Sequence, residues 1–498
     1  MSLFAVLLEP TSLLAVSVLV LSLLWWRSTR RPPGLPPGPG PALPLLGHLH
    51  LLDKDPRPKF REWRRQYGDV FSLYMGGQLV VVLNGYHVIK EALVKNADVF
   101  SDRPYSFLND RIDENKGLVG TSGTHWKEQR KVSLEILREM GLGKNVLAEK
   151  VQEEVTYYIK ALNSFEGRPA DVEEMTHKSV SNNIGSIVFG KRFEYDDPTF
   201  THNLKCMDEN IKIIGANAVI NFFPWLEYLP GDLFKLKLAL ANVALVENQL
   251  SHPQIKAHVD TYSDGDAKDF IHAYIREIRK REESGQPTTI DEENLVKVIG
   301  DLFNAGTETT ATAIRWALVF FLHNPDVQDK CYDEIQRVVG TERAPSMRDK
   351  PELTYLEATI MEVLRRANVV PFALQHGLSR DVTFHGYTIP KDAVVLPFQE
   401  TALSDPEMWE EPTAFRPERF IGADGKLLKP DPFIPFGIGR RVCLGEPLAR
   451  MELFLYLATM IQHFRFLPPE DGQLPSLEGI LALTHSPKPF MVRAIPRE

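Results

Sequence analysis

Cysteine is scarce in this sequence, which has only Cys206, Cys331 and Cys443 in 498 residues. Three widely spaced cysteines cannot form a disulfide framework, so we expect most of the chain to face a reducing compartment. The sequence also lacks internal repeats, heptad runs and the paired Cys/His spacings of zinc sites. The ordinary role of a lone cysteine is a buried, inert thiol, so any chemical role for one of the three must come from its context.

An excess of positive charge is also missing. Lys and Arg total 57 against 66 Asp and Glu, which gives a net charge of −9. Nucleic-acid-binding proteins carry a basic footprint, so this balance argues against a nucleic-acid partner. The hydrophobic content of 43% and the charged content of 25% are typical of a globular protein.

Long apolar runs are absent except at the N-terminus. The stretch TSLLAVSVLVLSLLWW, Thr11 to Trp26, carries no charge, and it extends back to Leu3 with one interruption at Glu9-Pro10. A membrane span needs about 20 residues. Three arginines follow the run and none precedes it, which places the rest of the chain in the cytoplasm. We therefore predict a membrane anchor over residues 1–26; a cleaved signal peptide is the alternative, but its charge would precede the apolar run.

The residues after this run change character twice. Residues 27–47 are basic and then proline-rich, with PPGLPPGPGPALPLLG from Pro32 to Gly47, and they predict a stiff hinge. From residue 48 to 498 no linker is evident. Long segments with apolar residues at three- and four-residue steps predict helices, and GYTIPKDAVVLPF has strand character. We expect one large domain that is mainly α with small β-sheets.

Cys443 lies in an unusual segment, PFGIGRRVCLGEPLAR, from Pro435 to Arg450. Nearby arginines and the start of a helix favour the thiolate, because both supply positive charge. Glycines have no Cβ, so the backbone around the cysteine can lie close to a flat ligand. A single thiolate does not suit zinc, but it suits haem iron, whose reaction with oxygen it promotes.

A second unusual segment, AGTETT, runs from Ala305 to Thr310 within the longest apolar helical pattern. Glycine in the middle of a helix costs about 1 kcal/mol relative to alanine. One interpretation is a polar helix face. The other is a local opening for dioxygen and water, in which Glu308 and Thr309 would relay protons.

The segment Phe436-x-x-Gly439-x-Arg441-x-Cys443-x-Gly445 resembles the haem-binding signature of the cytochrome P-450 monooxygenases. The resemblance spans nearly the whole chain and is closest to the animal microsomal type, family 2 and the steroid hydroxylases. It implies the cytochrome P-450 fold and a haem b, iron protoporphyrin IX, with Cys443 as the axial thiolate and metal ligand.

The resemblance also implies roles for residues outside this segment. Glu308 and Thr309 match the family's catalytic acid–alcohol pair. Glu362, Arg365 and Arg419 match a structural network. The cofactor-binding residues that match donors to the haem propionates are Trp126, Arg130, His376, Arg441 and Arg103. One stretch, Phe398 to Trp409, departs from the family pattern, with Glu400 and Leu403 where a tryptophan and a histidine are usual.

The function implied by the resemblance is insertion of one oxygen atom from O2 into a lipophilic substrate. NADPH-cytochrome P-450 reductase would supply electrons from NADPH, with cytochrome b5 as a further candidate partner, at the endoplasmic reticulum membrane. A basic patch of Lys127, Lys131 and Arg440 would attract an acidic partner. The substrate could be a fatty acid, a steroid or a xenobiotic. The expected pocket residues are Phe107, Leu118, Val119, Ile213, Ile214, Ala305, Val370, Phe372 and Leu483.

Two other functions remain open at this point. A haem-thiolate isomerase or dehydratase would rearrange lipid peroxides without a reductase, but it would not need the Glu308–Thr309 pair. A non-catalytic, membrane-tethered haem protein would act only as a sensor or a carrier and would catalyse no reaction. An electron carrier of that kind would have a second axial ligand, and none is evident in AGTETT.

Overall fold

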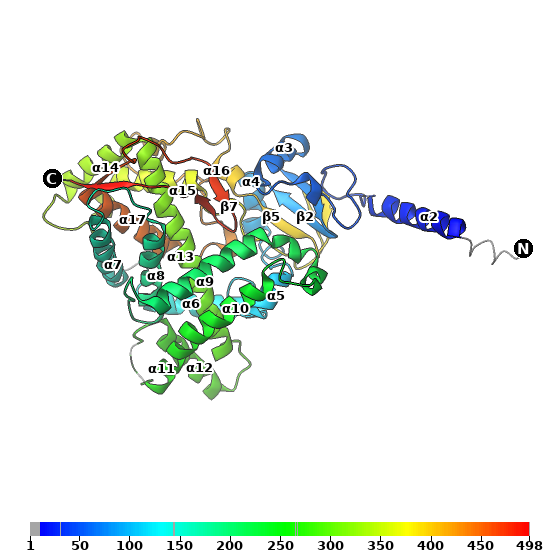
Figure 1. The fold of residues 1–498 in the computed structure, drawn as a ribbon, viewed down its shortest axis with the longest axis horizontal. Coiled ribbons are helices and arrows are strands. Elements are labelled where there is room, and N and C mark those ends of the chain that lie inside the picture. Colours follow the sequence, from blue (N-terminus) through cyan, green and yellow to red (C-terminus); the bar gives the residue numbers. More distant parts are fainter. Residues whose placement is uncertain (1–9, 30, 143–144, 264, 266, 498) are drawn as a thin grey trace, which may run out of the picture. The chain divides into compact units, whose positions relative to one another are not determined.

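The computed structural model describes residues 10–29, 31–142, 145–263, 265 and 267–497. The chain divides into two compact units. Unit 1 comprises Met1–Pro104 and Phe372–Phe398, and unit 2 comprises Tyr105–Pro371 and Gln399–Glu498. The described residues are mainly helical with short strands, which confirms the predicted mainly α fold with small β-sheets (Figure 1).

Unit 1 is built around a three-stranded sheet. Strands β1, Val70–Met75, and β2, Gln78–Leu83, form an antiparallel hairpin, and β5, Val394–Pro397, pairs in parallel with β2. Apolar side chains of this sheet pack on α3, Arg57–Tyr67, in a buried aromatic core. The remaining elements of unit 1 are α2, Pro10–Thr29, η1, Leu49–Leu51, α4, Tyr86–Lys90, η2, Glu91–Lys95, β3, Val382–Phe384, and β4, Tyr387–Ile389.

The predicted anchor coincides in part with α2, while residues 1–9 lie outside the described residues. Of the helices that the structure describes, none combines the length and the apolar character needed to cross a membrane, so the transmembrane helix stays a prediction. The proline-rich segment is bonded to strands of unit 1. The Ser72 N–H donates to the Pro37 carbonyl at 2.7 Å, and the Thr388 N–H donates to the Gly34 carbonyl at 2.8 Å. These contacts hold Gly34 and Pro37 of the predicted hinge against the strands of unit 1.

Unit 2 contains most of the helices and two small antiparallel sheets. Strand β6, Phe464–Leu467, pairs with β9, Arg493–Pro496, and β7, Gly479–Leu481, pairs with β8, His485–Pro487. The α-helices are α5, Phe107–Asp113, α6, Gly123–Glu139, α7, Asn145–Asn163, α8, Glu173–Val188, α9, Pro198–Ala216, α10, Leu236–Val246, α11, His252–Asp260, α12, Phe270–Ser284, α13, Glu292–His323, α14, Pro325–Val338, α15, Thr354–Ala367, α16, Glu400–Leu403, and α17, Glu446–His463.

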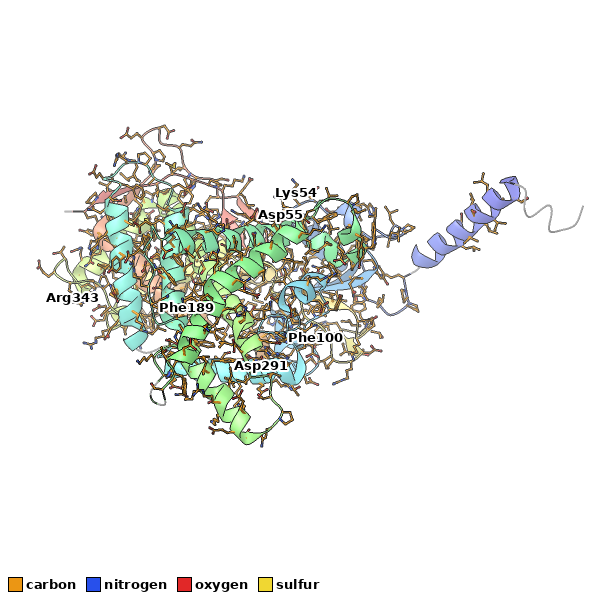
Figure 2. The ribbon with its side chains drawn as sticks, turned by 60° about the horizontal axis from the view of Figure 1, so that its bottom comes forward. Lys54, Asp55, Phe100, Phe189, Asp291 and Arg343 are labelled. Carbon is orange, nitrogen blue, oxygen red and sulfur yellow. The ribbon has the colours of Figure 1, made fainter. Side chains whose placement is uncertain are left out.

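Helix α13 is the central element of unit 2. It begins at Asp291, whose side chain caps the first turn by accepting the Asn294 N–H at 2.7 Å (Figure 2). Its second half is buried on all sides against α8, α15, α17 and β8, as expected for a helix that is apolar all round. Phe189, labelled in Figure 2, stacks on Phe303 of α13 with ring centroids 5.1 Å apart. This packing fixes the AGTETT segment within the core of unit 2.

Candidate functional site

The Cys443 loop has a backbone that only its glycines can adopt. Gly437 and Gly439 have φ angles of 74° and 81°, in the left-handed region that disfavours side chains. The Cys443 N–H donates to the Phe436 carbonyl at 3.0 Å, which closes the loop. Helix α17 begins at Glu446, so the first N–H groups of a helix lie beside the sulfur.

Cys443 differs from the other two cysteines in its environment. Cys206 and Cys331 are buried, whereas Cys443 is exposed. Burial raises the pKa of the Cys331 thiol to about 12, as expected for an inert core residue. Desolvation by the surrounding loop also raises the pKa of Cys443, but the N–H groups of Gly445 and Glu446 and the Arg130 guanidinium oppose that shift. Cys443 is therefore the cysteine at which backbone N–H groups and a guanidinium together favour a thiolate.

Three predicted cofactor-binding residues lie together next to Cys443. The Arg441 guanidinium carbon is 3.8 Å from the centre of the Trp126 ring, and the Arg130 carbon is 5.9 Å from it. Arg130 Nη2 donates to the Val442 carbonyl at 2.6 Å. Burial lowers the pKa of Arg130, and the sulfur of Cys443 opposes this shift. Two partly desolvated cations and an indole N–H are suitable donors for carboxylates of a bound ligand.

Arg103 and His376 belong to unit 1 and lie near each other there. Arg103 Nη1 donates to the carbonyls of Leu374 and Gln375 at 3.1 and 2.7 Å. His376 is buried, and its Nδ1 donates to the Phe100 carbonyl at 2.6 Å. This bond places a proton on Nδ1 of the ring. Their predicted contact with a haem propionate stays a prediction.

The AGTETT segment of α13 begins with an exposed residue, Ala305, and is otherwise partly or fully buried. Asn304 and Ala305 are exposed although the helix beyond them is buried. The Thr309 hydroxyl donates to the Ala305 carbonyl of its own helix at 2.8 Å. A Cβ on Gly306 would lie 2.5 Å from Cδ1 of Ile184, so any larger residue here would force this side chain of α8 to shift. The predicted opening for dioxygen and water stays a prediction, and the sequence did not indicate this packing against Ile184.

Glu308 points away from the exposed side chains and is held by hydroxyl groups. Its Oε1 accepts hydrogen bonds from Thr484 at 2.8 Å and from Thr312 at 3.2 Å. Its Oε2 lies 3.6 Å from Nε2 of His177. The structure thus brings a carboxyl and an imidazole together beside Thr309, and sequence reasoning did not identify the imidazole.

The residues of unit 2 fit a haem in their chemistry. Cys443 offers an accessible sulfur on a loop whose glycines have no Cβ to obstruct a flat ligand, and Arg130 and Arg441 can neutralise carboxylates. No group of three or more His, Cys, Asp or Glu side chains suited to a metal occurs in the described part of the chain. The donor that the Cys443 loop offers is a single sulfur, which suits haem iron better than a zinc site.

The predicted Glu–Arg–Arg network is present and buried. Glu362 accepts from Arg365 Nε at 2.7 Å and Nη2 at 2.8 Å, and from Arg419 Nε at 3.2 Å. The stretch from Phe398 to Trp409 joins this network, because Arg365 Nη1 donates to the Leu403 carbonyl at 2.9 Å and the Arg365 guanidinium lies over the Trp409 ring. One of its unusual residues, Leu403, therefore bonds to the structural network through its backbone carbonyl.

A buried carboxyl that the sequence did not single out lies on α17. Glu452 accepts from Asn183 Nδ2 at 2.9 Å and from the Thr310 hydroxyl at 3.2 Å. Burial raises the pKa of Glu452 to about 8, and these two hydrogen bonds oppose the shift only in part. The carboxyl is therefore mostly protonated at neutral pH, next to the AGTETT segment.

We expect the Glu452→Gln variant to remove a pH-dependent loss of stability. The pKa of Glu452 is about 8 in the folded protein and 4.5 by its ordinary value. Between these two pH values the unfolded chain gives up the proton and the folded protein keeps it, so the free energy of unfolding falls as the pH rises. Within that window the wild type should lose on the order of 1.4 kcal/mol per pH unit relative to the variant. Urea unfolding at several pH values measures this difference. Glu470→Gln, at a side chain that is 80% exposed, is the control; parallel curves for Glu452→Gln and wild type would contradict the expectation.

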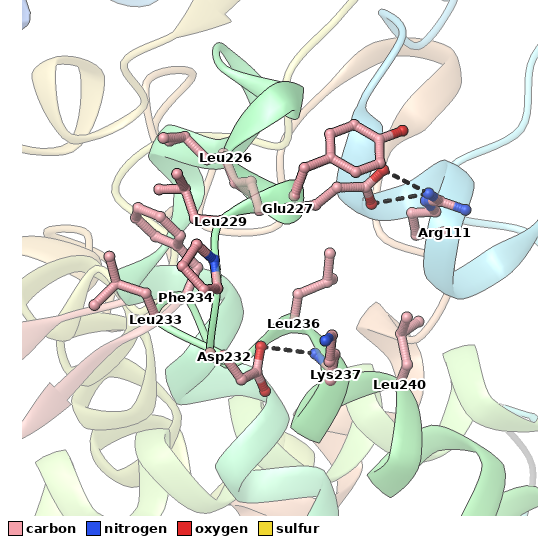
Figure 3. Close-up of a pocket in the computed structure, with 14 residues that line it drawn as sticks. Arg111, Leu226, Glu227, Leu229, Asp232, Leu233, Phe234, Leu236, Lys237 and Leu240 are labelled. Carbon is pink, nitrogen blue, oxygen red and sulfur yellow. Dashed lines mark hydrogen bonds and ion pairs between the residues drawn. The ribbon is translucent and has the colours of Figure 1, made fainter.

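A pocket lies on the surface of unit 2, between α5, the two short 3-10 helices Ala218–Asn221 and Pro224–Tyr228, and α10 (Figure 3). Arg111 and Glu227 form an ion pair of 2.7 Å at its edge. None of the nine predicted substrate-pocket residues lines it. Phe107 instead belongs to a buried cluster with Leu108, Ile220 and Leu236.

Other predicted pocket residues have varied surroundings. The N–H groups of Leu118 and Val119 donate to Asp301 Oδ2 at 2.6 and 3.1 Å, which fixes their loop on α13. Leu483 is 44% exposed. Phe372 stacks on Phe398 in the core of unit 1, with ring centroids 4.5 Å apart. A common substrate pocket formed by these residues stays a prediction.

The sequence matches one protein family and several known proteins over most of its length. The sequence model of the family Cytochrome P450 matches residues 36–494. Cytochrome P450 2U1 of Homo sapiens is 39% identical over 502 residues, which cover 95% of this chain and 92% of the relative. Cytochrome P450 2K4 of Oncorhynchus mykiss is 39% identical, covering 93% and 92%. Cytochrome P450 2D14 of Bos taurus is 37% identical, covering 97% and 98%.

Proposed function

The chain belongs to the cytochrome P450 family, and on that premise we propose that it oxygenates a lipophilic substrate at the endoplasmic reticulum membrane. Members of the family bind haem b through a cysteine thiolate and take electrons from NADPH through a reductase. The chain is accordingly a haem-thiolate monooxygenase. Its substrate is a fatty acid, a steroid or a xenobiotic, and residues 1–26 anchor the chain with its catalytic domain in the cytoplasm.

The observation that carries the proposal is the environment of Cys443. An exposed thiol on a loop with two left-handed glycines, next to two N–H groups and Arg130, suits an iron-binding thiolate. Trp126, Arg130 and Arg441 would bind a haem propionate, with His376 and Arg103 as further donors. When bound, the haem supplies the oxidising chemistry that transfers one oxygen atom to the substrate. The other oxygen atom leaves as water, with two electrons from NADPH and two protons.

The residues of α13 would deliver those protons. Thr309 carries a hydroxyl within the AGTETT segment of the helix, and the carboxyl of Glu308 is the adjacent acid. A hydroxyl can accept a proton from one neighbour and donate another, so it can transmit a proton without a net change. Glu308 would supply the proton and Thr309 would direct it toward the oxygen site.

We expect Thr309→Ala to uncouple NADPH consumption from product formation. Without the hydroxyl, the proton path is incomplete, and electrons are lost to reduced oxygen species. The ratio of product to NADPH consumed should fall by about tenfold or more, within the range typical of a lost proton donor. Thr309→Ser keeps the hydroxyl and serves as the control, with a ratio close to that of wild type. Equal coupling in the alanine and serine variants would remove Thr309 from the proton path.

The redox partner would bind the basic patch of Lys127, Lys131 and Arg440. All three side chains are exposed, and Lys127 and Lys131 are four residues apart on α6, on the same face. Arg440 is part of the Cys443 loop, so an acidic partner on this patch would lie close to the thiolate. NADPH-cytochrome P-450 reductase is the proposed donor, and cytochrome b5 is a second candidate for the same surface.

The test is reconstitution of the full chain in lipid vesicles with the reductase, NADPH and oxygen. A panel of fatty acids, steroids and aromatic compounds is first screened for a change of haem spin state. We expect oxygenated product only when NADPH and the reductase are both present. Rearrangement of a lipid hydroperoxide without NADPH would instead indicate an isomerase or dehydratase. A bound haem that oxidises no member of the panel would indicate a non-catalytic protein.

A further inference from the structure

His177 on α8 is an unusual neighbour for a proposed catalytic acid. Its Nε2 lies 3.6 Å from Glu308 Oε2, and the two side chains are only 15% and 11% exposed. The Nε2 atom itself is buried and has no hydrogen-bond partner within the described protein. A buried polar atom without a partner costs free energy, so its placement beside a carboxylate calls for an explanation.

The orientation of Glu308 makes the pairing specific. Its Oε1 accepts from Thr484 and Thr312, which leaves Oε2 directed toward His177. A distance of 3.6 Å exceeds that of a hydrogen bond, so the contact between these two atoms is electrostatic. The close approach of α8 to α13 at Gly306 places the two helices near enough for this contact.

The charged side chains near His177 and Glu308 form ion pairs with other residues. Glu173, on the same helix as His177, pairs with Arg315 of α13 at 2.7 Å. Lys212 of α9 pairs with Asp208 at 2.7 Å, and the carboxylates of Asp208, Glu173 and Glu308 raise its pKa against the effect of burial. His485 on β8 bonds through Nδ1 to the Ala367 carbonyl. Among these groups, His177 is the side chain that lies beside Glu308 Oε2 and can carry a proton on a ring nitrogen.

We infer that His177 is a positioning residue that acts through Glu308 by returning a proton to it after each turnover. In this step the proton on His177 Nε2 moves to Glu308 Oε2, which leaves a neutral imidazole and a protonated carboxyl. Because Nε2 itself is buried, the imidazole regains its proton from water after a rotation of the ring brings Nε2 to solvent, which the 15% exposure of the side chain allows. No electrons move in the step. This inference rests on the proposed monooxygenase function and names the residue that reloads its proton path.

The first test is the His177→Gln variant of the full-length haem-loaded enzyme, assayed with reductase and NADPH. Glutamine can donate a hydrogen bond but cannot titrate. We expect the ratio of product to NADPH to fall severalfold and the solvent isotope effect to rise, with haem content and the carbon-monoxide spectrum unchanged. His258→Gln removes another histidine–carboxylate pair, to Asp269 at 2.9 Å, and should leave the ratio unchanged.

The second test does not depend on turnover. Thermal unfolding midpoints are measured for wild type, His177→Gln, Glu308→Gln and the double variant. Because a protonated imidazole attracts a carboxylate, the shifts should be non-additive at about pH 6 and additive at about pH 8.5. The same cycle for His258 and Asp269 is the positive control, since their hydrogen bond raises the pKa of His258.

The outcomes separate the inference from the function on which it rests. If wild type makes product and His177→Gln has the same coupling and isotope effect, the role of His177 is wrong and the proposed function stands. Additive shifts at both pH values would also overturn the pairing. If wild type makes no NADPH-dependent product with any member of the panel, the proposed function fails and the role of His177 fails with it.

Discussion

Replacing Cys443 with serine is expected to reduce monooxygenase turnover to background while the protein remains folded. The side chain is exposed and its loop is set by glycine conformations and by the backbone bond from Cys443 to Phe436, neither of which needs sulfur. A serine hydroxyl, however, remains protonated at neutral pH and cannot replace a thiolate as a donor to iron. The expected loss is therefore in chemistry and not in stability.

The measurement is the carbon-monoxide difference spectrum of the reduced protein, together with NADPH-dependent turnover. Cys206→Ser and Cys331→Ser are matched controls at buried thiols, and both should keep the thiolate spectrum. Cys331 bonds to the Thr359 hydroxyl at 3.4 Å, so its serine variant also tests that a buried sulfur can be lost without effect on the spectrum. A Cys443→Ser protein that holds haem with the wild-type spectrum would refute the assignment of the ligand.

The parts of the site that could be predicted from the sequence are those encoded within one short segment. The Cys443 loop is of this kind, because its glycines, arginine and cysteine are separated by only one or two residues and their spacing alone fixes the turn. The Arg365–Glu362 pair is also local, since residues three apart lie on one face of a helix. The mainly α architecture followed from helical periodicity over long segments.

The parts that could not be predicted arise from contacts between distant segments. Nothing in the sequence near Gly306 indicates that Ile184 lies 2.5 Å from the position a Cβ would take. His177 and Glu308 lie on different helices, and the sequence around either residue does not indicate the other as its neighbour. Glu452 occurs in an apolar helix where a single carboxyl resembles a surface residue until Asn183 and Thr310 are placed beside it. Such pairs become visible only when α8, α13 and α17 are packed together.

The second large effect is expected from Glu362→Ala. The side chains of Glu362 and Arg365 are 0% and 1% exposed, and that of Arg419 is 7% exposed. Burial already lowers the pKa of Arg419, against the attraction of Glu362, which shows that the site is poorly solvated. Loss of the carboxylate leaves two buried guanidinium groups without their counter-ion, and breaking a buried pair in this way costs about 3–5 kcal/mol.

The free energy of unfolding from urea titration measures this cost, and Glu410→Ala is the matched control. Glu410 pairs with Arg416 at 3.2 Å, but its side chain is 79% exposed, so its loss should change stability by less than about 1 kcal/mol. Glu362→Gln keeps hydrogen-bond acceptance without the charge and should have an intermediate effect, which provides a measurable variant if the alanine protein does not fold. A Glu362→Gln protein as stable as wild type would mean that hydrogen bonds, and not charge, hold Arg365 and Arg419 in place.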